Sequence, residues 1–181
     1  QQIQRLSEPS LMEKVTQVWG NVRTLDQDKQ KAVLAIKKIV ESDKPASDLQ
    51  AGQAVFKKIC GQCHVLFGEG GKIGPELTGS NRRDINYLLE NIMDPSAVMA
   101  KEYQPWIVRT VDDQVFTGLL REATESSIRL QTATEEVVIY TQDIDEKKQS
   151  DQSMMPADLL SPLSETEIKA LFDYLRANGP K

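Results

Sequence analysis

Apolar residues recur at helical spacing in several parts of the chain, most regularly near its C-terminal end. Ser164 and Glu167 form an S-x-x-E capping box, which is typical of a helix start. Four apolar residues then follow at helical spacing: Ile168, Leu171, Phe172 and Leu175. Because Gly179 and Pro180 end the pattern, the sequence predicts a helix from Ser164 to about residue 177.

The same period predicts helices in the first half of the chain. Their ranges are residues 10–22, residues 26–40, a segment that runs from a Ser47–Gln50 capping box into residue 60, and about Arg82 to Met93. Asp94 and Pro95 are expected to open a further short helix. Residues 41–45, which are charged and contain a proline, are typical of a linker.

The pattern changes between residues 104 and 144. Four short runs there are rich in β-branched and aromatic residues and are separated by polar turns: 106–111, 115–120, 127–132 and 137–141. They predict a four-stranded antiparallel β meander. The expected fold class is therefore mainly α, with an N-terminal helical extension over residues 1–46 and a main domain over residues 47–181 that carries the β insertion at about 104–144.

Composition narrows the class of protein. The 181 residues are 39% hydrophobic, and no stretch reaches the roughly 18 to 20 apolar residues of a membrane-spanning helix. The balance of 22 Lys and Arg against 27 Asp and Glu gives a net charge of −5, the wrong sign for a protein that binds nucleic acid through phosphates. The first residues do not form a signal peptide, so we expect a cytoplasmic protein, a processed one, or a fragment of a longer chain.

The chain has two cysteines and one histidine, and all three lie within five residues: Cys60, Cys63 and His64. Apart from methionine, these are its only sulfur and imidazole ligands for a metal. A Cys-x-x-Cys-His run is typical of covalent haem attachment, in which both thiols bond the haem and the imidazole binds iron. A zinc site is less favoured because it normally needs four Cys or His ligands. A thioredoxin-like pair would be expected at a helix start, and two thiols without any cofactor remain the plainest alternative.

A single histidine excludes a bis-histidine haem within one chain. The other axial ligand must then be methionine, lysine, tyrosine or water, or that position is open. Met12, Met93 and Met99 lie in or beside predicted helices, where methionine usually fills the core. Met154 and Met155 lie in a polar loop, and Pro156 restricts Met155 to extended geometry. Met155 is therefore the preferred sixth ligand, with Met154 or an open site as alternatives.

The residues around the motif resemble cytochromes c. Gly52 and Phe56 stand eight and four residues before Cys60, where that family places residues that cross the last helix closely. Gly74, Pro75 and Leu77 resemble its Gly-Pro-x-Leu segment. The resemblance implies that the Pro75 carbonyl accepts a hydrogen bond from His64, which would fix the tautomer of the ring, and that Leu77 packs on the haem.

Several segments together resemble one family, the haem-binding domain of the Pirellula/Verrucomicrobium type. They are 18–20, 60–64, 74–79, 94–96 and 153–156 followed by Leu159. Ala157 and Asp158 stand where the family often has glycine. The resemblance implies a cytochrome c-like module at the end of a large secreted dehydrogenase-like protein, with a redox protein or a fused dehydrogenase domain as its partner.

These features predict a one-electron carrier rather than an enzyme. One covalent haem c with His64 and Met155 as axial ligands keeps the same ligands in both oxidation states. The resemblance implies a periplasmic location, because haem attachment in bacteria occurs outside the cytoplasm. The alternative is a haem-based ligand-binding or sensor domain with a displaceable or absent sixth ligand. A peroxidase is less favoured because no second histidine is present.

Overall fold

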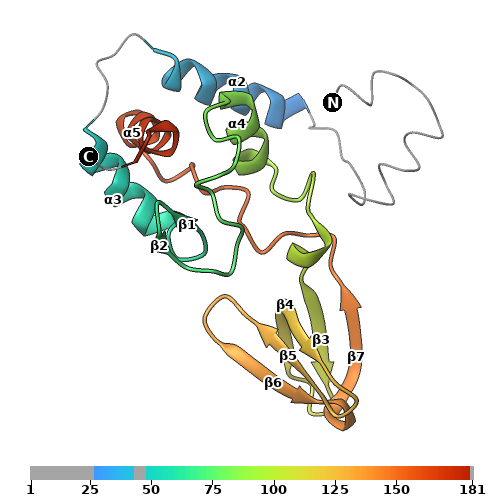
Figure 1. The fold of residues 1–181 in the computed structure, drawn as a ribbon. Coiled ribbons are helices and arrows are strands. Elements are labelled where there is room, and N and C mark those ends of the chain that lie inside the picture. Colours follow the sequence, from blue (N-terminus) through green and yellow to red (C-terminus); the bar gives the residue numbers. More distant parts are fainter. Residues whose placement is uncertain (1–26, 43–47, 180–181) are drawn as a thin grey trace, which may run out of the picture. The chain divides into compact units, whose positions relative to one another are not determined.

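The computed structural model describes residues 27–42 and 48–179 (Figure 1). Contacts divide the chain into two compact units. Of the described residues, the helical unit holds 27–42, 48–94 and 156–179, and the sheet unit holds 95–155. The helix predicted over residues 10–22 and the cap predicted at Ser47 lie outside the described residues.

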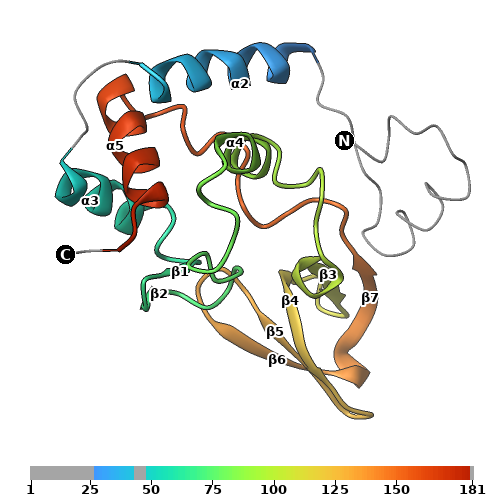
Figure 2. The same cartoon turned by 45° about the horizontal axis from the view of Figure 1, so that its top comes forward.

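The helical unit contains four α-helices among its described residues. They are α2 (Gln27–Val40), α3 (Leu49–Ile59), α4 (Ile85–Met93) and α5 (Glu165–Arg176). A small hairpin of β1 (Val65–Leu66) and β2 (Glu69–Gly70) follows α3. Helices α3 and α5 lie side by side, and α2 packs on both α4 and α5 (Figure 2). Segments from both ends of the described chain therefore build this unit.

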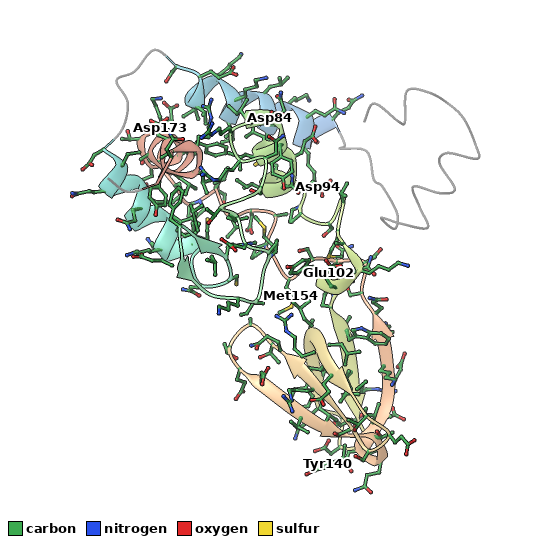
Figure 3. The ribbon with its side chains drawn as sticks, in the orientation of Figure 1. Asp84, Asp94, Glu102, Tyr140, Met154 and Asp173 are labelled. Carbon is green, nitrogen blue, oxygen red and sulfur yellow. The ribbon has the colours of Figure 1, made fainter. Side chains whose placement is uncertain are left out.

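Side-chain caps explain where these helices begin. The predicted capping box of α5 is confirmed: the Ser164 hydroxyl accepts from the Glu167 amide, and the Glu167 carboxylate accepts from the Ser164 amide. Asp84 caps α4 by accepting from the amides of residues 86 and 87 (Figure 3), and Asp48 caps α3. The short helix predicted at Asp94 is wrong, because residues 95–98 form turns and the next helical residues are a 3-10 turn, η2 (Lys101–Tyr103).

The core of the helical unit comes mainly from α3, α4 and α5. The α5 stripe predicted from the sequence is fully buried, and the helix contributes one aromatic pair to α3, in which the rings of Phe56 and Tyr174 lie 5.7 Å apart. The other large buried hydrophobic side chains of this unit are Val40, Val55, Leu66, Leu88, Leu89, Ile92 and Leu160. Because the Leu66 side chain is fully buried, the start of the hairpin also contributes to the core of the helical unit.

The sheet unit is a five-stranded antiparallel sheet. Its strands are β3 (Trp106–Thr110), β4 (Val115–Ala123), β5 (Ser127–Gln131), β6 (Glu136–Tyr140) and β7 (Ile144–Gln149). They pair in the order β6-β5-β4-β3-β7, so β6 and β7 form the two edges (Figure 1). The four predicted strands are confirmed. Their inward residues form a separate core of Val108, Ile128, Leu130 and Ile139.

The prediction of a mainly α fold is wrong. About 35% of the described residues are helical and about 23% are in strands, and the sheet has a fifth strand that the meander lacked. Strand β7 was missed because only Ile144 is apolar and the next five residues are polar and exposed. Pairing with β3 creates it, and Arg109 of β3 bridges Asp145 at 2.6 Å and Glu146 at 3.6 Å.

No helix among the described residues is long and apolar enough to cross a membrane.

Candidate functional site

The Cys60–His64 segment forms one tight turn at the C-terminal end of α3. The Cys60 amide closes the last helical turn by donating to the Phe56 carbonyl at 2.8 Å. The Cys60 carbonyl then accepts from the amides of Cys63 and His64, at 3.1 and 3.0 Å. These backbone bonds place both thiols and the imidazole on one short piece of fixed chain.

The environment of Cys60 is unfavourable for thiolate chemistry. Burial, and secondarily the charge of the neighbouring Cys63, raises the pKa of the Cys60 thiol to about 12. A thioredoxin-like pair depends instead on a lowered pKa at the positive N-terminal end of a helix. Cys60 lies at the negative C-terminal end of α3, so the structure disfavours this redox alternative.

The imidazole of His64 is oriented by a backbone carbonyl. Its Nδ1 lies 2.8 Å from the carbonyl oxygen of Pro75, which accepts only, so Nδ1 carries the proton and donates. The hydrogen bond that the resemblance implies is therefore present. It leaves Nε2 unprotonated in the neutral ring, with its lone pair available to a metal.

Glycines allow the loop after the motif to approach His64 closely. A Cβ at Gly74 would lie 2.6 Å from Cε1 of the His64 ring, and the Gly74 amide donates to the Cys63 carbonyl at 2.8 Å. Gly70 has φ of +126°, and a Cβ there would lie 2.1 Å from the His64 carbonyl oxygen. Any larger residue at either position would push the loop, and with it the Pro75 carbonyl, away from the imidazole.

The turn of the β1–β2 hairpin connects this loop to the rest of the helical unit. Phe67 and Gly68 both have positive φ, 54° and 84°, as in a type I′ turn. The Phe67 amide donates to the Thr78 hydroxyl at 2.8 Å, and the Leu77 amide donates to the Val65 carbonyl at 2.8 Å. The strand that follows His64 is thus hydrogen-bonded to the segment that follows Pro75.

Arg82 joins that segment to the end of α5. Its side chain is buried and donates to the carbonyls of Thr78 at 3.1 Å, Leu175 at 2.7 Å and Ala177. The guanidinium carbon also lies 4.8 Å from the centre of the Phe67 ring, within range of a cation–π contact. Burial, and secondarily the charge of Arg83, lowers the pKa of Arg82. Arg82 was missed as a site residue because arginine in a sequence normally indicates solvent exposure.

The close crossing of α3 and α5 lies about two turns before the motif. A Cβ at Gly52 would lie 2.2 Å from the Ala170 carbonyl oxygen and 2.7 Å from Cβ of Tyr174. Phe56 packs on the Tyr174 ring in the next turn of α3. Gly52 and Phe56 therefore occupy the helix crossing that the resemblance assigns to them, and this crossing fixes where α3 ends.

Leu77 and the two candidate methionines are half-buried. Met155 is the last residue of the sheet unit in its part of the chain, and Pro156 begins the return to the helical unit. The loop before it is fixed within its own unit: the Ser153 amide donates to the Ser96 hydroxyl at 2.9 Å, and the Met155 amide donates to the Ser153 hydroxyl at 3.1 Å. The 94–96 and 153–156 segments named above are thus directly connected.

The remaining methionines behave as structural residues where they are described. Met99 is buried and Met93 is the last residue of α4, whereas Met12 lies outside the described residues. Within residues 27–42 and 48–179, no group of three or more His, Cys, Asp or Glu side chains could hold a metal ion. Cys60, Cys63 and His64 therefore do not converge as a zinc site would require.

No protein-family model and no curated protein matches this chain. Among solved structures, the chain is similar to a crystal structure of the pleiotropic translational regulator Hfq. The two sequences are 15% identical, the match covers 39% of this chain and 97% of that chain, and the TM-score is 0.27. A likeness at this level carries no argument, and the function proposed below depends on the residues of this chain alone.

Proposed function

We propose that this protein is a c-type haem domain that transfers single electrons. One observation carries the proposal: in a Cys-x-x-Cys-His turn, Nδ1 of His64 donates to the Pro75 carbonyl at 2.8 Å, which leaves Nε2 for a metal. A histidine ligand commonly donates its second ring N–H to a carbonyl or carboxylate, because this fixes the tautomer and makes the coordinating nitrogen more basic.

The residues of the turn fit a covalently bound haem. The thiols of Cys60 and Cys63 would form the two thioether bonds, and His64 would be the proximal ligand. When bound, a haem supplies an iron that gains and loses one electron. This chain contributes the attachment, the orientation of the imidazole through Pro75, and the rigidity of the surrounding loop; Leu77 would add apolar contact.

The sixth ligand proposed is Met155. The support comes from the sequence, since Pro156 favours an extended Met155, and from the two serine hydrogen bonds that hold its loop. A thioether ligand raises the reduction potential relative to a second imidazole. We further propose, from the family resemblance alone, that the domain is periplasmic, has no catalytic residues of its own, and exchanges electrons with a redox protein or a fused dehydrogenase domain.

Optical spectra of the haem-loaded protein test the proposal. The chain would be expressed with a cytochrome c maturation system, as wild type, Met155→Ala and Met154→Ala. We expect a covalent haem and a low-spin spectrum with a sulfur-to-iron charge-transfer band that disappears in Met155→Ala and persists in Met154→Ala. Failure to attach haem would refute the proposal itself. A high-spin wild type, or one unaffected by both substitutions, would refute Met155 ligation and favour the ligand-binding alternative.

A further inference from the structure

Strand β6 leaves a row of backbone groups at an open edge of the sheet. Antiparallel pairs alternate between hydrogen-bonded and non-hydrogen-bonded residues. The Thr141 amide donates to the Ser126 carbonyl and the Thr132 amide to the Glu135 carbonyl, which sets the alternation along β5 and β6. The amides and carbonyls of residues 136, 138 and 140 therefore point away from β5, and no other described strand pairs with them.

The two edges of the sheet differ in how well they are protected. Strand β7 carries charged side chains from Asp145 to Lys148, and its pairing with β3 is interrupted by a register shift at Arg109 and Thr110. Charges and bulges of this kind oppose the addition of another strand. Strand β6 has the sequence Glu-Val-Val-Ile-Tyr, with no proline, no lysine and a regular register along β5.

An open pocket of mixed polar and apolar lining adjoins the open strand. It has a volume of about 380 Å³ and is lined by β6 residues 137–140, by the turn between β3 and β4, by Phe116 and by Asp143. Three of its apolar side chains are mostly in solvent: Val111 is 66% exposed, Val138 53% and Tyr140 58%. Tyr140 lies at the end of β6 (Figure 3). A pocket beside a free strand edge offers space for the side chains of an added strand.

The charge of this unit selects the partner. Residues 95–155 hold six Lys and Arg against eleven Asp and Glu, a balance of −5 that equals the net charge of the whole chain. Asp112 and Asp143 line the pocket, and Glu136 lies on the exposed face of β6. Asp112 is held in place by Thr110 and by Gln114, whose Nε2 donates to its Oδ2 at 3.0 Å. Like charge opposes docking of a second copy of this unit and favours a basic partner.

We propose that β6 is a docking edge for an extended segment of another protein in which lysine or arginine alternates with apolar residues. The segment adds as a sixth strand, and its main chain hydrogen-bonds to residues 136, 138 and 140. Because successive side chains of a strand point to opposite faces, its basic side chains enter the pocket, which Asp112 and Asp143 line, and its apolar side chains lie on the other face of the sheet. This inference goes beyond electron transfer and does not depend on the haem.

A substitution on β6 separates strand addition from simple charge attraction. Val138→Pro removes an amide that points to the open edge without removing a bond to β5, and proline is tolerated at edge positions. Val138→Thr is the matched control, because it keeps the amide and the β-branched shape. Both variants would be compared with the wild type by circular dichroism and thermal melting to establish that the sheet is retained. If Val138→Pro does not fold, the wild type is tested instead with peptides of the same charge that are N-methylated at every valine or at every lysine, one of which must lose its hydrogen bonds to the edge; equal binding of all three peptides would then overturn the proposal.

Binding of the labelled peptide acetyl-Lys-Val-Lys-Val-Lys-Val-Lys-amide to the full chain would be followed by fluorescence anisotropy at low salt. We expect saturable binding, a loss of at least about tenfold in Val138→Pro and in the double variant Asp112→Asn, Asp143→Asn, little change in Val138→Thr, and at least about tenfold weaker binding when glutamate replaces lysine. Equal binding by wild type and Val138→Pro, or no binding up to about 1 mM, would overturn the proposal. So would light scattering that shows a dimer lost in Val138→Pro, because the occupant would then be a second copy.

Discussion

Arg82 gives the sharpest test of how the helical unit is held together. Arg82→Met keeps an unbranched apolar stem of similar length and removes the guanidinium. Three backbone carbonyls then lose their donor: those of Thr78, Leu175 and Ala177. The contact with the face of the Phe67 ring is lost as well.

The magnitude follows from the burial of each contact. The bond to Leu175 is buried, and leaving that carbonyl unpaired costs about 1 to 3 kcal/mol. The other two carbonyls are partly exposed and regain water, so each loss costs about 0.5 to 1 kcal/mol. The cation–π contact adds about 1 kcal/mol. Methionine avoids the cost of burying a charge, which offsets about 1 to 2 kcal/mol, and the net expected loss is about 1 to 5 kcal/mol.

Urea unfolding followed by far-UV circular dichroism measures this loss. The midpoint should fall while the slope with urea stays unchanged. Arg83→Met is the matched control, because Arg83 is exposed and its side chain bonds only Asn178 among the described contacts. We expect it to change the free energy of unfolding by less than about 0.5 kcal/mol. Equal effects of the two substitutions, or a loss below about 1 kcal/mol for Arg82→Met, would refute the reasoning.

Two further predictions address the ends of α3 and α5. Gly52→Ala should destabilise the protein by about 1 to 3 kcal/mol in the same urea assay, because its Cβ would overlap the Ala170 carbonyl. Gly79→Ala is the control and should have little effect, because a Cβ there would have nothing within 4 Å. A larger loss of stability in Gly79→Ala than in Gly52→Ala would contradict the helix crossing. The backbone and side chain of Ser164 lower the pKa of Glu167, so its stabilising effect is present above the unfolded pKa of about 4.3 and is lost as pH falls through the lower folded value. The melting temperature of Glu167→Gln should therefore fall less than that of the wild type between pH 5 and pH 3, and parallel curves would exclude this contribution.

Local patterns predicted the elements whose own residues define them. Helix α5 was predicted from its capping box and apolar stripe, and β3 to β6 from short runs that are rich in β-branched and aromatic residues and are separated by polar turns. Strand β7 was not predictable in this way, since its residues are polar and it exists because β3 offers an edge and Arg109 pairs with its carboxylates. The fold class was wrong for the same reason: the size of the sheet depends on pairing over distance.

The same distinction between local patterns and distant contacts applies to the candidate site. The spacing of Cys60, Cys63 and His64 was sufficient to single out the turn, and the resemblance supplied the contact of Pro75. Nothing local indicated Arg82, because its partners at Leu175 and Ala177 lie more than ninety residues away. The closeness of Gly74 to the imidazole likewise follows from the path of the loop and not from a glycine in the sequence.

The crossing of α3 and α5 has a consequence for the order of folding. The five strands follow one another between residues 106 and 149, and β3 to β6 pair with neighbours in sequence. Gly52 and Phe56 pack against Ala170 and Tyr174. These two residues are synthesised after all five strands of the sheet unit. During synthesis the sheet unit can form first, while α3 and the turn at Cys60 stay without their packing partner. The turn at Cys60 therefore gains its packing partner only when the last segment of the described chain has been synthesised.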